Sequence, residues 1–384
     1  MQRSAGCYAA AAVVLMCLAL PASASEKLSV PTVQSRSQVF KYHTADPYDR
    51  ANLYGFNHAP SVVQMPDGRL LAAWFSGPYE AAVNQVILGC YSSDGGVTWS
   101  DIVVLQDDPI RSDFDPAFIH AGDRVYMCYS VGRWNKYPSY RPGPGEEAAT
   151  GPESFTIQCR WSDDSGATWS EPVRMHDSTG WGCRSNGIQL KTGELILPTH
   201  DFLNWQAAGL KSSDNGKTWV RSEPIDPGGV KVAEPCIAQC ASGTLIMATR
   251  CRDGVMRFSR STDLGGSWSA PEEAGIVAGD SSPSLIALSD GTLVLAYTAS
   301  PPPNRTSLGI RTSKDEGRTW SDVLEVASVE AAKPGEDFWS HSACYPSATE
   351  LPGGRVLVVW TQISMSPSWQ GGTIESAIIQ LNGN

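Results

Sequence analysis

Four side chains in this sequence could together attack an acidic substrate. Glu234, Arg250 and Tyr345 lie in short polar tracts, and Arg305 follows a run of three prolines. A tyrosine phenol, with a pKa of about 10, is a poor nucleophile until a neighbouring carboxylate takes its proton. Paired guanidiniums bind a planar carboxylate through two hydrogen bonds each. Apart from one another, the four would be solvated loop residues or structural salt bridges, so their meaning depends on the fold.

The element that must position these residues is a repeated motif, Ser-x-Asp-x-Gly-x-Thr/Ser-Trp, called here the Asp motif. It occurs five times, at 92–99, 162–169, 212–219, 261–268 and 313–320. We expect the Asp to accept backbone N–H bonds two residues on, the Gly to supply positive φ, and the Thr or Ser to cap the turn. The Trp is expected to pack into the core below. A motif that recurs at intervals of about 50 residues is typical of a repeat architecture.

Between the Asp motifs lie pairs of short apolar strands joined by glycine turns, and no helical periodicity extends over a useful length. The six turns contain Gly68, Gly122, Gly193, Gly243, Gly291 and Gly353. Four strands in each of six units predict an all-β, six-bladed β-propeller with four-stranded antiparallel blades. The last unit lacks an Asp motif, so we expect its third strand at 374–381 and its outer strand at 37–42, closing the ring. An insertion is expected at 133–152, in the second blade.

The strand order assigns the Asp motifs and the glycine turns to one end of the propeller. Function is then expected at the opposite end, which we call the mouth, where the loops vary and the inner strands begin. The expected starts of inner strands are His58, Asp115, Arg184, Glu234, Ser282 and Tyr345. The loops between second and third strands supply Glu80, His200, Asp201, Arg250, Arg252 and Arg305. Asp201 and Asp280 are interpreted as loop caps, with a role as a further acid of the site as the alternative.

Composition narrows the partners and the compartment. The formal net charge of −11 argues against nucleic acid or an anionic membrane as a partner, but not against a small acidic ligand. A basic start, an apolar run at 9–20 and an Ala-x-Ala site predict a signal peptide at 1–24, cleaved after Ala24. We therefore expect residues 25–384 to form a single propeller domain that is secreted or periplasmic, without membrane insertion. Nothing in the sequence indicates the oligomeric state.

Eight cysteines follow the expected signal peptide. An even number in an exported protein permits disulfides, and Cys128 with Cys159 is the favoured pair because they fall on neighbouring expected strands. Free cysteines buried in the core are an equal alternative. The sequence has no Cys-x-x-Cys and few histidines, so neither a metal nor a cofactor is predicted.

The Asp motifs and the six expected blades resemble the sialidase (neuraminidase) superfamily, whose members carry Asp-box or BNR repeats, over nearly all of the mature chain. The segment 234–250 is similar to the one in which a Glu opens a strand and an active-site Arg ends the next. This resemblance implies that Glu234 activates the nucleophile and that Arg250 binds the substrate carboxylate. Tyr345 matches the family's nucleophilic tyrosine, and Arg305 matches a further arginine, with Arg311 as the alternative.

Two positions depart from the family pattern. The family's first arginine lies in an Arg-Ile-Pro tract, and here His58 stands in its place, before Ala59-Pro60. The family's aspartate acid/base lies in the next loop, where this chain offers only Glu80. The resemblance therefore implies Glu80 as the acid/base and His58 as a weaker cationic contact or proton donor. Arg184 is an alternative source of the missing positive charge.

Together these observations predict a sialidase-like exo-glycosidase that releases a terminal acidic sugar with retention of configuration. The predicted partner is accordingly a glycan or acidic sugar, and Tyr345 would act as the nucleophile in place of the usual carboxylate. Two alternatives stay open. One is a polysaccharide lyase that uses His and Tyr to move protons on a uronic acid. The other is a glycan-binding propeller without chemistry.

Overall fold

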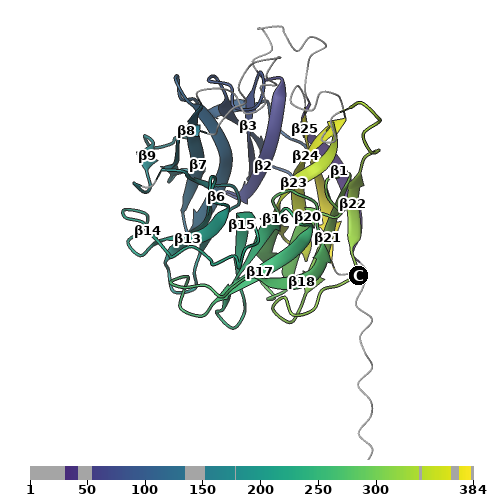
Figure 1. Ribbon diagram of the computed structural model, residues 1–384. Coiled ribbons are helices and arrows are strands. Elements are labelled where there is room, and N and C mark those ends of the chain that lie inside the picture. Colours follow the sequence, from purple (N-terminus) through teal and green to yellow (C-terminus); the bar gives the residue numbers. More distant parts are fainter. Residues whose placement is uncertain are drawn as a thin grey trace, which may run out of the picture.

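The computed structural model describes residues 31–41, 54–134, 152–177, 179–336, 340–364 and 372–381. They form six antiparallel sheets arranged as the blades of a propeller, which confirms the predicted all-β fold (Figure 1). Within these ranges, no helix is long and apolar enough to cross a membrane. The signal peptide expected at 1–24 and most of the insertion expected at 133–152 lie outside the described residues.

Blades 1 to 5 run from an inner to an outer strand in chain order, and blade 6 takes its outer strand from the start of the chain. Blade 1 contains β2 (Phe56–Gln64), β3 (Leu70–Gly77), β4 (Val86–Ser92) and β5 (Val103–Gln106). Blade 2 contains β6 (Ser112–Ala121), β7 (Arg124–Trp134), β8 (Pro152–Ser162) and β9 (Val173–Arg174). Blade 3 contains β10 (Trp181–Cys183), β11 (Ile188–Gln189), β12 (Leu195–Asp201), β13 (Gln206–Ser212) and β14 (Val220–Arg221).

Blade 4 contains β15 (Val232–Gln239), β16 (Leu245–Cys251), β17 (Val255–Ser261) and β18 (Glu272–Val277). Blade 5 contains β19 (Ser284–Ala287), β20 (Leu293–Thr298), β21 (Ser307–Ser313) and β22 (Leu324–Ser328). Blade 6 contains β23 (His341–Leu351), β24 (Arg355–Ser364), β25 (Thr373–Gln380) and β1 (Thr32–Phe40).

Blades 3 and 6 differ from the simple repeat. In blade 3 the inner strand is interrupted, and its two parts, β10 and β11, both pair with β12. In blade 6 the outer strand is β1, which pairs antiparallel with β25 from Thr32 opposite Gln380 to Phe40 opposite Ile374. Figure 1 shows β1 beside the yellow C-terminal strands. The ring is therefore closed as predicted, by a strand that begins earlier than expected.

The core is divided among the blade interfaces. In the described residues, each pair of neighbouring blades encloses one cluster of buried apolar side chains. The cluster between blades 6 and 1, for example, includes Trp74, Leu88 and Leu357, all fully buried. Each large apolar side chain buried in this way contributes about 1.5–3 kcal/mol. Many such contacts give a rigid ring on which loops at the mouth can be held in place.

The Asp motif forms the same turn in each of its five copies, between the third and outer strands. In the first copy, Asp94 accepts the N–H of Val97 at 3.1 Å and that of Thr98 at 2.9 Å, and Thr98 Oγ1 donates to its second oxygen at 2.6 Å. The Asp thus reaches three and four residues on, and the expected spacing of two is wrong. Ser92 Oγ accepts the N–H of Gly96 at 2.8 Å, which closes the turn from the other side.

The glycine at the fifth position of each Asp motif also packs against the preceding blade. Gly96 has φ of 93°, and a methyl group added there would lie 2.8 Å from Leu357 in blade 6. At Gly216 the same addition would lie 2.8 Å from the ring of Tyr126 in blade 2. The Tyr126 hydroxyl in turn donates to the carbonyl of Asn215 at 2.8 Å. Each Asp motif is therefore a contact between blades as well as a turn.

The favoured disulfide is not formed. Cys128 and Cys159 lie directly opposite each other on β7 and β8, as expected, but their sulfur atoms are 3.8 Å apart. A disulfide requires a sulfur–sulfur distance of about 2.05 Å. All eight cysteines in the described residues are free and buried, so they serve as small apolar core residues.

The Asp motifs predict a loss of stability in acid. Hydrogen bonds from the Thr98 hydroxyl, the Thr98 N–H and Ser92 lower the pKa of Asp94 to about 2. Because an unfolded aspartate has a pKa of about 3.9, this stabilisation is present above about pH 4 and is lost as the pH falls through about 2. We expect Asp94→Asn to lower the thermal unfolding midpoint at pH 7 and to lose most of that difference near pH 2.

Scanning calorimetry from pH 7 to pH 2 would measure the effect, with exposed Asp101→Asn as the matched control outside the turn. An unchanged difference between Asp94→Asn and the wild type across this range would contradict the expectation.

Candidate active site

The inner strands of blades 1, 2, 4 and 6 share a bulge near the mouth, at each of which the pairing register shifts. At each bulge the residue before a proline has positive φ: Ala59 (56°), Asp115 (49°), Glu234 (43°) and Tyr345 (55°). A bulge can redirect a side chain while the rest of the strand keeps its alternation. These residues therefore lie inside their strands, and the prediction that they begin the inner strands is wrong.

Three side chains from blades 4 and 6 form one hydrogen-bonded group. Arg250, in β16, donates from Nη1 to Glu234 Oε1 at 2.6 Å and to Tyr345 Oη at 2.9 Å. Tyr345 Oη lies 3.3 Å from Glu234 Oε1, to which it donates. A phenol, a carboxylate able to accept its proton and a guanidinium are thus in direct contact. This is the arrangement that a tyrosine nucleophile requires.

Asp280 holds the other side of Arg250. Its carboxylate accepts a hydrogen bond from Arg250 Nε at 2.6 Å, and both side chains are largely buried. Burial opposes the ionisation of Asp280, but the hydrogen bond and charge of Arg250 outweigh it, so the pKa of Asp280 is lowered. The interpretation of Asp280 as a loop cap is wrong, because it is an ion-pair partner. Asp201 does cap its loop, accepting the N–H groups of Leu203 and Asn204.

Tyr345 is enclosed by cationic and aromatic groups. The guanidinium carbons of Arg184 and Arg305 lie 5.1 and 5.3 Å from the centre of its ring. The ring of His58 packs edge-on at 4.4 Å. Burial raises the pKa of the Tyr345 phenol, although the charge of Arg250 acts in the opposite direction. The phenol is therefore protonated at rest, and its activation depends on Glu234.

His58 is a neutral aromatic group in this environment. It lies in β2 and is 7% exposed, between the rings of Tyr345 and Phe75. Burial is the largest cause that lowers its pKa, well below the ordinary value, and the charges of Arg305, Arg184 and Arg250 add to it. A neutral imidazole does not supply the positive charge that the family's arginine would supply at this place.

Glu80 lies in the loop between β3 and β4 and is half-buried at the mouth. Burial raises the pKa of its carboxyl group, and the charges of Arg305, Glu234 and Arg250 also act on it. Three charged groups of the site are thus close enough to Glu80 to influence its ionisation. A carboxyl group that keeps its proton at higher pH is suited to act as a general acid.

Three further arginines, Arg305, Arg311 and Arg184, differ in what their side chains contact. Arg305 is 5% exposed and lies at the mouth, where its carbonyl accepts the N–H of Ala343 from β23 at 2.6 Å. The alternative, Arg311, donates to the hydroxyl of Tyr297 at 2.9 Å, within blade 5, so Arg305 is the arginine that the structure places beside Tyr345. Arg184 is 1% exposed and donates hydrogen bonds to the main-chain carbonyl groups of Pro60 and Tyr345.

Four phenylalanine rings form an apolar wall beside Tyr345. Phe56, Phe75, Phe114 and Phe155 form one buried cluster with Tyr345. Phe75 and Phe114 meet edge-on, with ring centres 5.3 Å apart, and connect blade 1 to blade 2. Such a wall excludes water and strengthens the electrostatic interactions of the adjacent charged groups.

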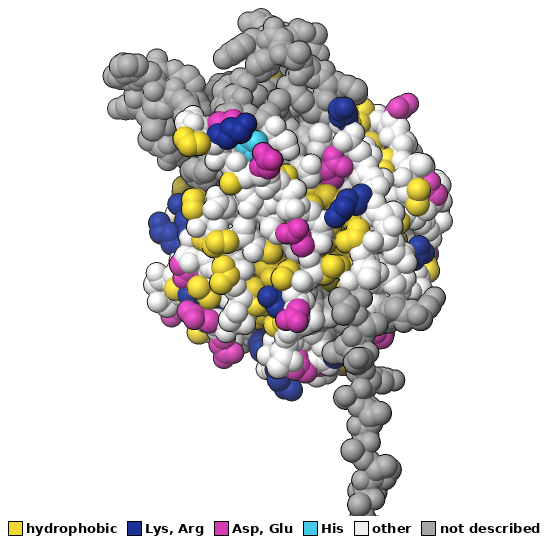
Figure 2. Space-filling view, turned by 90° about the vertical axis from the view of Figure 1, so that its right-hand side faces the viewer, with side chains coloured by type: hydrophobic (Ala, Val, Ile, Leu, Met, Phe, Trp, Pro, Cys, Tyr) yellow, Lys and Arg dark blue, Asp and Glu magenta, His cyan; other side chains and the backbone are white. Residues whose placement is uncertain are grey.

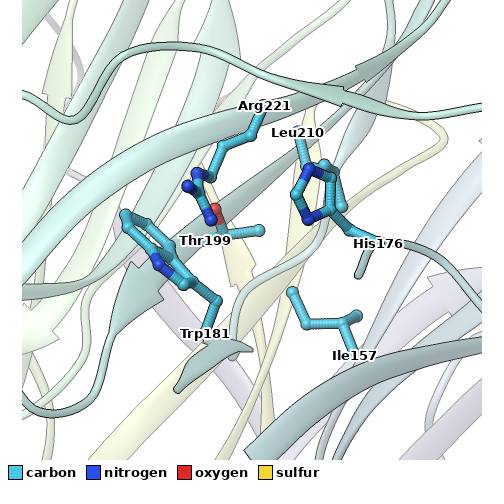
Figure 3. A pocket seen from close by; sticks show the side chains of 6 residues that line it. All are labelled: Ile157, His176, Trp181, Thr199, Leu210 and Arg221. Atoms are coloured by element: carbon cyan, nitrogen blue, oxygen red, sulfur yellow. The ribbon is translucent and has the colours of Figure 1, made fainter. Parts of the chain in front are cut away.

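Other hollows lie away from this group. Figure 3 shows a pocket of about 10 Å³ between blades 2 and 3, in which Arg221 stacks on Trp181 at 4.1 Å. This volume is enough for about one water molecule. A larger cleft of about 720 Å³ lies between the same blades and includes Trp161 and Trp219, but none of the site residues. In the described ranges, no three His, Cys, Asp or Glu side chains are grouped to hold a metal ion.

Among the described residues, the face of the molecule in Figure 2 has no patch of a single charge that would suggest another binding site. Figure 2 shows one face of the molecule, on which acidic and basic side chains are interspersed singly or in small groups. The described part of that face therefore carries no continuous basic surface.

A family model for the BNR repeat-like domain matches residues 68–358 of this chain. The chain belongs to this family, within the sialidase superfamily. A sialidase from Micromonospora viridifaciens is 27% identical over an alignment of 354 residues that covers 82% of this chain and 52% of that protein. A sialidase from Paraclostridium sordellii is 27% identical over an alignment of 236 residues that covers 54% of this chain and 56% of that protein. The chain spans about half the length of these curated relatives.

Solved structures of the superfamily share the fold. An intramolecular trans-sialidase from Ruminococcus gnavus superimposes with a TM-score of 0.68 at 16% identity, covering 91% of this chain and 98% of that one. A protein of unknown function from Dyadobacter fermentans superimposes with a TM-score of 0.71 at 17% identity, covering 92% of this chain and 99% of that one. At such identities the similarity establishes the fold alone.

The sequence predicts no role in the site for Asp115. Its carboxyl group is 3.9 Å from Arg184, and burial raises its pKa to about 8, against the charge of Arg184. A signal was present in the sequence: residue–Pro pairs recur in the inner strands, at Pro60, Pro116, Pro235, Pro283 and Pro346. Asp115 stands in the same position of that repeat as Glu234 and Tyr345.

Because burial lowers the pKa of His58 well below its ordinary value, we predict that the imidazole is still neutral at the pH where a free histidine is half protonated, about 6.5. Long-range ¹H–¹⁵N correlation spectra distinguish a neutral ring from an imidazolium, and His58→Gln would assign the signal among the six histidines of the chain. A ring that becomes charged at or above its ordinary pKa of about 6.5 would contradict the geometry described here.

Proposed function

We propose that this protein is an exported retaining exo-glycosidase of sialidase type that releases a terminal acidic sugar. The observation that carries the proposal is the contact of Tyr345 Oη with both Glu234 and Arg250. Export to the periplasm or the medium is part of the proposal, because residues 1–24 have the pattern of a signal peptide. The sialidases among the relatives support the substrate class.

Two arginines would hold the carboxylate of the sugar. Glu234 and Asp280 occupy Nη1 and Nε of Arg250, which leaves Nη2 without a partner among the described residues. Both acids fix the plane of the guanidinium, so that it is oriented before the substrate arrives. Arg305, on the side of blade 5, would provide the second cation.

In the first half of the reaction, Tyr345 Oη attacks the anomeric carbon and its proton moves to Glu234. The bond from that carbon to the leaving oxygen breaks, and Glu80 donates a proton to this oxygen. In the second half, a water molecule gives a proton to Glu80 and attacks the same carbon. The bond to Tyr345 then breaks with its electron pair on Oη, and Glu234 returns the proton. Two displacements at one carbon retain its configuration.

Removing the hydroxyl of Tyr345 is the primary test. Tyr345→Phe should lower kcat for an aryl glycoside of an acidic sugar by about 10³-fold or more, because the nucleophile is lost. Tyr297→Phe is the matched control, since Tyr297 is equally buried and its hydroxyl contacts Arg311 in blade 5. Substrates with N-acetylneuraminic acid and with uronic acids, assayed in parallel, would identify the sugar.

Two results would overturn the proposal. Products that absorb as unsaturated uronates would indicate a lyase. Binding of acidic glycans without release of sugar, unchanged in Tyr345→Phe, would indicate a binding propeller.

The role of Glu80 predicts a dependence on the leaving group. Glu80→Gln should slow the release of poor alkyl leaving groups by about 10²–10⁴-fold, and should barely affect p-nitrophenol, which leaves without protonation. Because burial raises the pKa of Glu80, the wild-type rate should fall on the alkaline side as this acid loses its proton. Rate–pH profiles of the wild type and of Glu80→Gln would show whether the alkaline fall in rate belongs to Glu80. Persistence of this fall in Glu80→Gln would refute the assignment.

A further inference from the structure

Arg184 is a fully buried cation at the centre of the propeller. It follows β10, at the point where the inner strand of blade 3 is interrupted, and its side chain is 1% exposed. It is the one charged residue among the largest fully buried side chains of the described chain. A buried charge carries a desolvation cost of several kcal/mol unless partners compensate for it.

The contacts of Arg184 cross the channel to two bulges. Its Nη2 donates to the carbonyl of Pro60 at 3.3 Å and to that of Tyr345 at 3.2 Å, and its Nη1 donates to Ser61 Oγ at 3.4 Å. Tyr345 has positive φ, and Pro60 follows Ala59, which also has positive φ. One side chain thus ties blade 3 to the irregular backbone of blades 1 and 6.

The guanidinium of Arg184 also acts on the phenol ring. It lies 5.1 Å from the centre of the Tyr345 ring. Among the residues that the structure describes, the one acid in ion-pair range is Asp115, at 3.9 Å. Burial raises the pKa of Asp115 to about 8, so this carboxyl group is mostly protonated at neutral pH and the geometric pair is not a full charge pair. The positive charge behind the ring is therefore largely uncompensated while the phenol is neutral.

We propose that Arg184 is a positioning residue for Tyr345, which fixes the bulged backbone below the phenol and favours the phenolate formed when the sugar leaves the tyrosine. This inference rests on the proposed glycosidase function. The step concerned is the second displacement, in which the bond from the anomeric carbon to Tyr345 Oη breaks and its electron pair stays on Oη. A cation behind the ring stabilises this charge until Glu234 returns the proton.

Other charged and titratable groups also surround Tyr345, and Arg305 is a second cation, 5.3 Å from the ring centre, whose charge lowers the pKa of the phenol. His58 contacts the ring from β2 but is neutral. Glu234 holds the proton at this step, and Arg250 contacts the hydroxyl group but is shared with Glu234. Arg305 and the adjacent thiol of Cys344 complete the surroundings.

A measurement without substrate tests the coupling directly. Tyr345 would be replaced by 3,5-difluorotyrosine, whose more acidic phenol titrates in an accessible range, and ¹⁹F NMR would follow its ionisation. Arg184→Met should raise the pKa of this phenol by about one unit, a tenfold change in its ionisation constant, and Arg184→Lys should restore most of the difference. Arg257→Met is the control, because Arg257 is similarly buried but pairs with Asp253 and Glu273 in blade 4.

Turnover tests the proposed step. With a p-nitrophenyl glycoside of the accepted acidic sugar, Arg184→Met should lower kcat by about 10–100-fold and lower KM as well, because the glycosyl–tyrosine intermediate accumulates. A burst of p-nitrophenol should appear, and Arg184→Lys should reduce it. Circular dichroism of each variant would show that the propeller is folded.

Three outcomes are distinguishable. An unchanged phenol pKa in folded Arg184→Met overturns the inference. Equal damage in the Lys and Met variants, without a burst, also overturns it, because Arg184 would then be merely structural. A shifted phenol pKa in a protein that releases no acidic sugar upholds the coupling of Arg184 to Tyr345 and overturns the proposed function instead.

Discussion

The site depends on a backbone irregularity that four inner strands share. At each bulge a residue before proline is held at positive φ, which costs a non-glycine residue about 1–3 kcal/mol. Such strain persists only where the surrounding structure enforces it, and here the dense clusters between blades do so. In exchange, Asp115, Glu234 and Tyr345 are brought from three different blades to one end of the channel.

Arg250 is the electrostatic centre of the group. It bonds Glu234, Asp280 and Tyr345 at once, so the positions of the carboxylates, the guanidinium and the phenol are mutually dependent. The neutral imidazole of His58 and the phenylalanine wall lower the polarity on the other side. The charged groups of the site thus lie in surroundings of low dielectric constant, where each charge acts more strongly.

The sequence was sufficient for the ring but not for the details of its centre. Asp motifs and glycine turns are local signals, because Asp94 and Gly96 act within a few residues, and six copies of the strand pattern leave one architecture. The pairing of Asp280 with Arg250 joins the loop between β18 and β19 to β16, 30 residues away in the chain, and has no local signal. The burial of Arg184 likewise depends on how the interrupted strand of blade 3 faces the channel.

Two further errors have the same origin. Cys128 and Cys159 were placed opposite each other correctly, but opposition on paired strands does not determine the distance between sulfur atoms. The prediction that the inner strands begin at the functional residues is wrong for Asp115, Glu234 and Tyr345. The register shifts show that these strands continue through the irregularity.

The strand that closes the ring also determines where the chain ends emerge. Thr32 lies opposite Gln380, and Gln380 pairs with Arg355 at the hairpin turn of blade 6, so both ends leave the propeller side by side on the face of the Asp motifs. That face is opposite the mouth. Any tether or neighbouring module joined to either end would therefore hold the propeller from behind and leave the mouth facing outward.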